Sequence, residues 1–149
     1  MKGLLGKLRN LDGYLRDFRL PDRPEVRFNY VTSQEDAAPR LYERSGIQVL
    51  VARPEMRQSF RDLEIPQSTF IETVFFILEK DMEAGKTDRL ECDQYDRLEE
   101  IAEEILELLF LNLSGCGLLG GLVVTDFVVR PEVKVFGSWN GYSVAISFS

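Results

Sequence analysis

Residues 69–79 read TFIETVFFILE, the most apolar run in a chain of 149 residues. Threonine, phenylalanine, isoleucine and valine dominate the run, and these residue types favour extended backbone in a packed sheet. A short, continuous apolar run of this composition predicts a strand buried on both faces, with a short helix as the competing interpretation. We therefore expect a sheet with this segment as its central strand.

Three further strands are expected on the N-terminal side of this run. Residues 26–30 alternate between apolar and polar side chains, which is typical of a half-buried strand. Residues 47–52, IQVLVA, form a stronger strand, and residues 57–62 alternate as a third. The polar segment 32–46 contains proline and glycine and predicts a long loop.

The end of the chain predicts a β-hairpin. Residues 122–130 and 132–136 read as strands interrupted by the intervening proline. Asn140 and Gly141 form the pair preferred in two-residue type I′ turns. Apolar side chains then alternate with serine and alanine over residues 142–149, so we expect a final strand at a sheet edge, open to another subunit.

Two amphipathic helices are expected. Residues 2–18 repeat leucine at intervals of three and four, with basic side chains on the opposite face. Residues 88–112 place an apolar stripe against a face of carboxylates, and Thr87 or Asp88 can cap the N-terminus. Nine acidic residues and two arginines lie between Asp88 and Glu107, so this segment carries a charge equal to the net −7 of the whole chain.

The order of these segments separates helices from runs of strands, which indicates an α+β fold. We expect a single domain over residues 1–149. Its mainly antiparallel sheet packs against the long acidic helix and the N-terminal helix and ends in the C-terminal hairpin. Apolar residues make up 44% of the chain and charged residues 29%, which is ordinary for a globular domain.

The composition argues against most catalytic chemistry. The chain has no histidine, which removes the commonest general base and the commonest metal ligand. Its two cysteines are too few for a zinc site, and we expect free, buried thiols, with a disulfide between them as the alternative. We therefore predict that the protein is not an enzyme and holds neither a cofactor nor a metal.

Two glycine motifs lack the context that their chemistry requires. Residues 115–120 match G-x-G-x-x-G, but a helix precedes them and a strand follows, the reverse of the dinucleotide-binding order. Residues 85–87, Gly-Lys-Thr, resemble the end of a phosphate-binding loop, but Lys80 occupies the position of its first glycine. We expect a turn at each place.

The candidate interface residues lie on the acidic helix and beside the predicted turn. A solvated face is the plain interpretation of the acidic stripe, and a subunit interface or the negative wall of a channel are the alternatives. A tryptophan beside the turn either anchors an interface or packs back over the sheet. The candidates are Glu99, Glu100, Glu103, Glu104, Glu107, Trp139 and Tyr142.

Charge and hydropathy limit the partners. A net charge of −7 disfavours specific binding to nucleic acid. No run of about 18 apolar residues and no signal peptide is visible, so we expect no membrane association and a cytoplasmic protein. The basic N-terminal helix is expected to dock on its own domain or on a neighbour.

Four segments carry a resemblance to a known family. They are Thr73–Lys80 (TVFFILEK), the polar turn 81–88, the helix Leu98–Leu109 and the ending Trp139–Ile146 (WNGYSVAI). In this order they resemble the tail terminator (tail completion) proteins of long-tailed bacteriophages, and the pattern covers most of the chain. The basic first helix and the glycine segment 115–121 do not match that pattern.

The resemblance implies a structural role in the virion. Such proteins form a ring, typically of six copies, that ends the tail tube and joins it to the neck and head connector, with DNA passing through the centre. Assembly takes place in the cytoplasm of the host bacterium, and a head-completion protein is the nearest variant. The alternative function is a cytoplasmic, non-enzymatic module that binds another protein through the acidic helix or the last strand.

Overall fold

The computed structural model describes residues 2–60, 66–81, 87–114 and 122–149, with the backbone alone described for 2–4, 58–60, 66–69 and 113–114. It confirms the α+β class. The helices are α1 (Lys2–Arg16), η1 (a 3₁₀ turn, Gln34–Asp36), α2 (Ala37–Leu41) and α3 (Asp88–Ser114). The strands are β1 (Arg27–Val31), β2 (Gln48–Ala52), β3 (Glu55–Phe60), β4 (Pro66–Lys80), β5 (Val124–Val135) and β6 (Trp139–Phe148).

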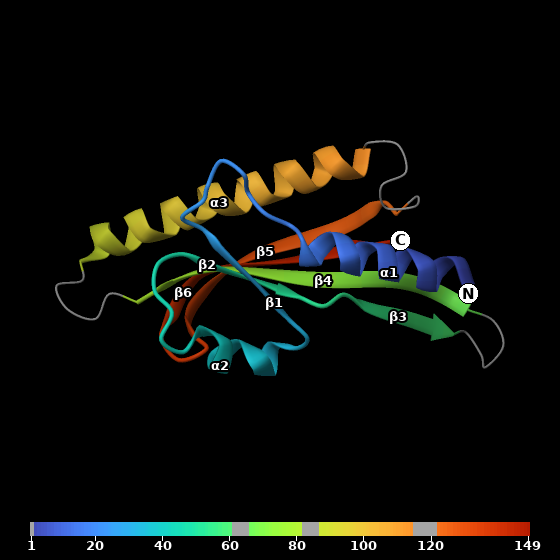
Figure 1. Ribbon diagram of the computed structural model, residues 1–149, viewed down its shortest axis with the longest axis horizontal. Helices are drawn as coiled ribbons and strands as arrows, with labels where there is room; N and C mark the ends of the chain where they lie inside the picture. The colour runs from blue at the N-terminus through green and yellow to red at the C-terminus, as the bar shows by residue number, and fades with distance from the viewer. Residues whose placement is uncertain (1, 61–65, 82–86, 115–121) are drawn as a thin grey trace.

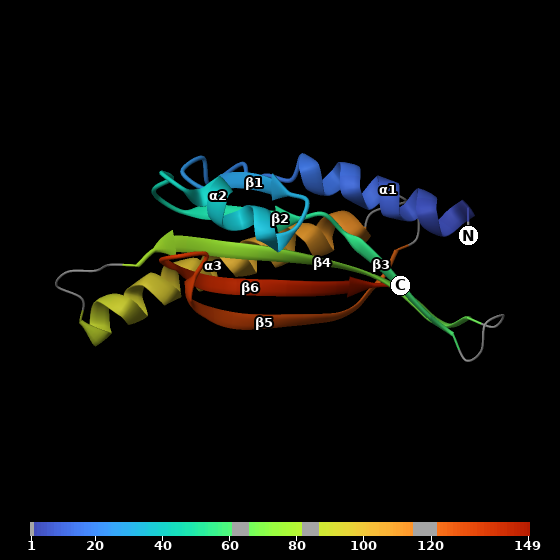
Figure 2. The same ribbon diagram turned by 90° about the horizontal axis from the view of Figure 1, so that it is seen from below.

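The described strands form one sheet in the order β1-β2-β4-β6-β5, with β3 pairing to the N-terminal part of β4. Only β1 and β2 run parallel, and α2 lies in the connection between them; every other described pair is antiparallel. Figure 2 shows β1 and β5 on opposite sides of the molecule. Among the described strands, β5 therefore bounds one side of the sheet, and β1 bounds the other side together with β3, which lies beside the N-terminal part of β4.

Strand β4 is the central strand that the apolar run predicts. It pairs with β2 and β3 on one side and with β6 on the other. Phe75 and Ile77 are fully buried in the core beneath the long helices, while Phe76 and Leu78 are buried in a second cluster with α2. Because both faces of this strand are covered, its apolar run is continuous rather than alternating.

Helices α1 and α3 cover the same face of the sheet (Figure 1). Leu11 and Leu15 of α1 and Ile105 of α3 are fully buried against strand residues such as Ile146. Burying each such side chain stabilises the fold by about 1.5–3 kcal/mol relative to leaving it exposed. The two predicted amphipathic helices are thus confirmed, and the Thr87 hydroxyl caps α3 by accepting a hydrogen bond from the Leu90 N–H at 3.2 Å.

Of the described helices, α2 packs on part of the opposite face of the sheet. The prediction of a loop over residues 32–46 was wrong, because this segment contains η1 and α2. Ala37 and Leu41 lie one helical turn apart and pack with Leu50 and Trp139. Burial of these two apolar side chains outweighs the weak helix propensity of a segment that contains Pro39.

The predicted hairpin geometry was wrong in two respects. Strand β5 continues through Pro131, and the turn lies at residues 136–138 rather than at Asn140 and Gly141. Both of those residues belong to β6. A Cβ on Gly141 would lie 1.8 Å from the Ile77 carbonyl oxygen, so close packing against β4 requires glycine there.

The buried amide of Asn140 fixes the start of β6. Its Nδ2 donates to the Asp81 carboxylate at 2.8 Å, and its Oδ1 accepts the Lys134 N–H at 2.8 Å. A fully buried polar side chain needs such partners. The role of Asn140 is therefore hydrogen bonding inside the fold, and it does not form a turn.

Strand β6 is not an edge strand, contrary to expectation. It lies between β4 and β5, and β5 forms the edge. Proline is tolerated in edge strands because half of their N–H groups have no partner to lose, which explains how β5 passes through Pro131.

The remaining predictions concern the cysteines, membrane-spanning helices and the glycine-containing turns. The thiol of Cys92 is free, as predicted, but exposed rather than buried. None of the described helices is long and apolar enough to cross a membrane. The polar turn at 82–86, the glycine motif and Cys116 lie outside the described residues.

Candidate subunit interface

Strand β5 presents an unusually apolar sheet edge. It is twelve residues long and, within the described ranges, pairs only with β6. Phe127 is 46% exposed and Val133 60%, and Val128 and Val129 are exposed as well. Long, exposed, apolar edge strands are templates for pairing with another chain, and soluble proteins usually shield them.

One flank of α3 lies along this strand. The Tyr95 hydroxyl donates to the Glu132 carbonyl oxygen of β5 at 2.6 Å, and the Phe110 ring meets the Phe127 ring edge to face at 5.9 Å between centroids. Glu99 and Glu103 follow Tyr95 at one-turn intervals and are exposed on the same flank. We define the acidic edge as β5 together with Asp96, Glu99, Glu103 and Phe110 of α3.

Tyr142 of β6 lies near the carboxylates of the acidic edge. Its ring packs edge to face against Tyr95 at 5.7 Å, and it is half-buried. Burial raises its pKa above the ordinary value, and the carboxylates of Glu99 and Asp96 raise the pKa further. Tyr142 therefore lies at the base of the acidic edge and does not form an outer contact.

The structure divides the predicted acidic stripe. Arg23 binds Glu104 through two guanidinium nitrogens, with Nε 2.9 Å from Oε2 and Nη2 2.7 Å from Oε1, and it lies 3.8 Å from Glu100. The hydrogen bond with Glu104 raises the pKa of Arg23. Glu107 is exposed and lines a shallow pocket with Leu20. The five glutamates thus face three different surroundings.

Trp139 adopts the second of its two expected arrangements. It is 3% exposed and packs in the cluster with α2, with the Lys80 ammonium 6.0 Å from its ring centroid. An exposed interface anchor at this position is therefore excluded for the isolated subunit.

Strand β1 forms the opposite, basic edge, which sequence reasoning did not single out. It pairs only with β2 within the described part of the chain. The Arg19 guanidinium lies over the Phe28 ring at 5.6 Å, and Arg16 lies over the Tyr30 ring at 5.2 Å. We define the basic edge as β1 together with Arg16, Arg19 and Arg27, all three of which are exposed.

Asp12 secures the basic edge to α1. Its carboxylate binds Arg16 at 2.8 Å and accepts a hydrogen bond from the Tyr30 hydroxyl. Burial and the hydrogen bond with Asp12 raise the pKa of Tyr30. The spacing of Arg16 and Arg19 along the N-terminal helix was the sequence signal available for this edge.

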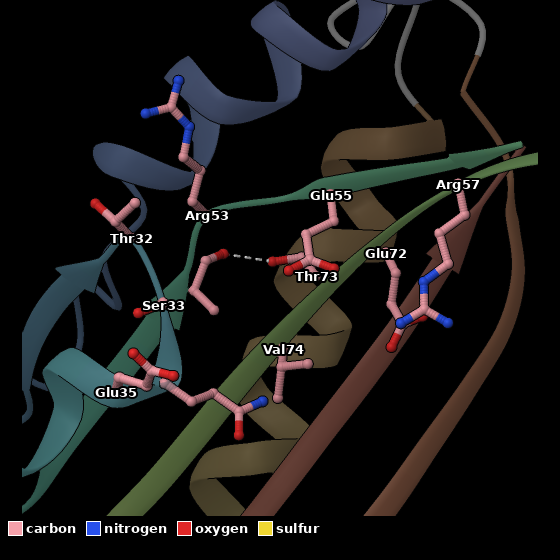
Figure 3. A pocket seen from close by; sticks show the side chains of 11 residues that line it. Thr32, Ser33, Glu35, Arg53, Glu55, Arg57, Glu72, Thr73 and Val74 are labelled. Atoms are coloured by element: carbon pink, nitrogen blue, oxygen red, sulfur yellow. Dashed lines mark hydrogen bonds between the residues drawn. The ribbon is translucent and has the colours of Figure 1, made fainter.

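A polar depression lies on the partly open face of the sheet, beside the turn at residues 32–35. Figure 3 shows Thr73 on its floor, where the hydroxyl donates to the Ala52 carbonyl at 2.8 Å, and the side chains of Arg57 and Glu72 pointing toward one another. Its volume is about 330 Å³. Within the described residues, no group of three or more potential ligands gathers into a metal site.

The comparisons with known proteins give no family to which this geometry can be referred. No protein-family model matches the sequence, and no curated protein matches it significantly. The two sheet edges, with their opposite charges and with the exposed apolar side chains of β5, are therefore the features from which a function can be argued.

Proposed function

We propose that this protein is a structural subunit of a phage tail or neck, which assembles into a ring that ends the tail tube and joins it to the head connector. The single observation that carries the proposal is the pair of unlike sheet edges. The acidic edge and the basic edge lie on opposite sides of one subunit, so each subunit offers complementary surfaces to two neighbours.

A subunit with two unlike surfaces associates head to tail. Such heterologous contacts give a closed ring when the rotation between neighbours divides a full turn, and an open filament otherwise. The resemblance in element order to tail terminator proteins favours the closed form, a ring of about six copies.

The outer face of α3 supplies a candidate channel wall. Glu107 is exposed there, one helical turn beyond Glu104 and lining the same pocket. Carboxylates along a channel repel the DNA backbone, so DNA would slide through without binding. The segment 32–46 and the outer face of α1 are the candidate contacts with tail-tube and neck proteins.

One observation favours a second function. An exposed strand such as β5 can accept an extended peptide as an additional strand, as many protein-binding modules do. A module of this kind would stay monomeric and would bind its target through β5 alone, leaving β1 without a role.

The native mass by light scattering over a concentration series, followed by negative-stain imaging, tests the proposal. A closed ring with a central hole is the expected result. Open filaments or a stable dimer would exclude ring closure by the isolated chain. A monomer at every concentration would favour the peptide-binding module. A pull-down would then identify the target, with a variant altered at the edge strand β5 as the control that no longer binds it.

A further inference from the structure

We infer that the acidic edge of one subunit binds the basic edge of the next, with β5 pairing to β1 so that the sheet continues across the subunit boundary. The inference rests on the proposed self-association and adds the surfaces, the strands and the residues that carry it. Three properties of the edges support it: the unpaired backbone, the placement of apolar side chains and the sign of the charges.

The backbone argument starts from the outer ladders. Within the described ranges, each edge strand pairs on one side only, so its outer N–H and C=O groups are free to pair. Strand β1 is five residues long, and the first half of β5 keeps a regular register with β6 over the five residues from Asp126 to Arg130, before Pro131 removes a donor. That first half of β5 is long enough to pair with the whole of β1.

Phe127 and Val129 of β5 lie on the same face of the sheet as Phe28 of β1. Phe127 and Val129 pair in register with Ile146 and Val144, which are buried beneath the helices. Phe28 packs against Phe18, next to α1 and therefore on the helix-covered side. A sheet continued from β5 into β1 of the next copy would place these side chains beside one another, in the cross-strand contacts that stabilise sheets.

The charges select head-to-tail pairing over the two symmetric alternatives. Joining β5 to β5 would bring the Glu99 and Glu103 carboxylates of two copies together, and joining β1 to β1 would do the same for guanidinium groups. Joining β5 to β1 instead brings Glu99 and Glu103 near Arg19, which lies over Phe28. Like charges across an interface oppose the wrong pairing, and complementary charges favour the right one.

A charge-swap experiment tests the inference. One variant, E99K/E103K, makes both edges positive, and a second, R19E/R27E, makes both edges negative. Each variant alone is expected to raise the concentration required for assembly at least about tenfold, whereas an equimolar mixture restores assembly because subunits of the two kinds can alternate. Light scattering of each sample gives the readout, and raising the salt concentration is expected to weaken wild-type assembly.

Two controls separate folding from binding. The variant E55K/D93K reverses two exposed carboxylates that belong to neither edge, one on β3 and one on α3, and is expected to assemble like the wild type. Thermal melts followed by circular dichroism show whether each variant is folded. If a charge reversal lowers the melting temperature, the neutral variants E99Q/E103Q and R19Q/R27Q replace the charge-reversed ones. Each neutral variant is expected to weaken assembly less, and mixing the two is not expected to restore it.

The outcomes distinguish the inference from the function. Normal assembly of both single-sign variants would overturn the edge pairing while leaving ring formation intact. If the two variants fail to assemble alone and also fail to assemble when mixed, the head-to-tail arrangement is overturned. A wild type that never self-associates would overturn the proposed ring and the edge pairing together.

Discussion

The two edges of the sheet are built alike but are charged oppositely. Each is a strand that, among the described residues, pairs on one side only, and each has aromatic side chains on the helix-covered face. At β1 those rings lie beneath guanidinium groups, whereas at β5 they lie beside the carboxylates of α3. The difference supports the proposed head-to-tail pairing of unlike edges over the pairing of like edges.

A second contrast separates β5 from its neighbour β6. The two strands form one hairpin, yet the side chains of β6 are mostly buried and those of β5 mostly exposed. Interior positions should therefore govern folding, and edge positions should govern association. The following predictions test that division, beginning with the largest effect.

Replacing Gly141 in β6 with alanine should cause the largest loss of stability. The new Cβ would lie 1.8 Å from the Ile77 carbonyl oxygen, so the β4–β6 pairing must shift. We expect a loss of about 3 kcal/mol or more in the free energy of unfolding, measured by urea denaturation. The control is Gly13→Ala in α1, where no atom lies within 4 Å and a gain of about 0.5–1 kcal/mol is expected. Equal effects at the two sites would contradict the assignment of Gly141 to close interior packing.

Phe127 on the edge strand β5 and Ile146 on the interior strand β6 form a cross-strand pair, so substitutions at the two positions compare edge and interior directly. Ile146→Ala should destabilise the monomer by about 2–5 kcal/mol, because the side chain is fully buried. Phe127→Ala should cost less than about 1 kcal/mol, since the ring is 46% exposed, but it should weaken self-association. Denaturation and light scattering on the same samples separate the two effects; unchanged association in Phe127→Ala would remove the apolar part of the interface.

Sequence reasoning succeeded where local pattern and tertiary environment agree. The run at 69–79 is apolar on both faces because helices cover one side of β4 and α2 covers part of the other. The stripes of α1 and α3 follow the 3.6-residue period because one face of each helix is buried. These segments predicted the α+β class and the long central strand.

Sequence reasoning failed where a tertiary contact overrides the local signal. Asn140 and Gly141 have the composition of a turn, but the Asp81 carboxylate and the Ile77 carbonyl determine their roles in β6. Pro131 looked like the end of a strand because the sequence does not show which strand is an edge. The acidic stripe looked uniform because the position of Arg23 beside Glu104 depends on how α1 and α3 pack.

Replacing Arg23 should have a smaller effect on stability, and it compares the part of α3 that Arg23 neutralises with the acidic edge. This residue neutralises part of α3 within one subunit, so Arg23→Gln should cost about 0.5–1 kcal/mol, less at high salt. Arg40→Gln, at an exposed position on α2, is the matched control and should change stability by less than about 0.5 kcal/mol. A loss that does not depend on salt would point to packing of the side chain rather than to charge.

The smallest expected effect is on the alkaline titration of Tyr142. Its pKa is raised by burial and by Glu99 and Asp96, so the folded state holds the phenol proton more tightly than the unfolded state. This contribution to stability is complete below the ordinary tyrosine pKa of 10.0 and is lost as pH rises through the folded-state pKa. Glu99→Gln should move the tyrosinate absorbance of Tyr142 to lower pH, with Tyr142→Phe identifying the transition. No movement would mean that the acidic flank of α3 does not act on the edge.

Hydrogen–deuterium exchange of the wild type, at concentrations below and above assembly, tests the pairing of unlike edges most directly. Assembly is predicted to slow exchange at residues 27–31 of β1 and 124–130 of β5 together, with the R19E/R27E variant as a matched reference that stays unprotected. Protection of both strands would support a sheet continued between subunits. Protection confined to one of these strands, or found only elsewhere on the molecule, would contradict it.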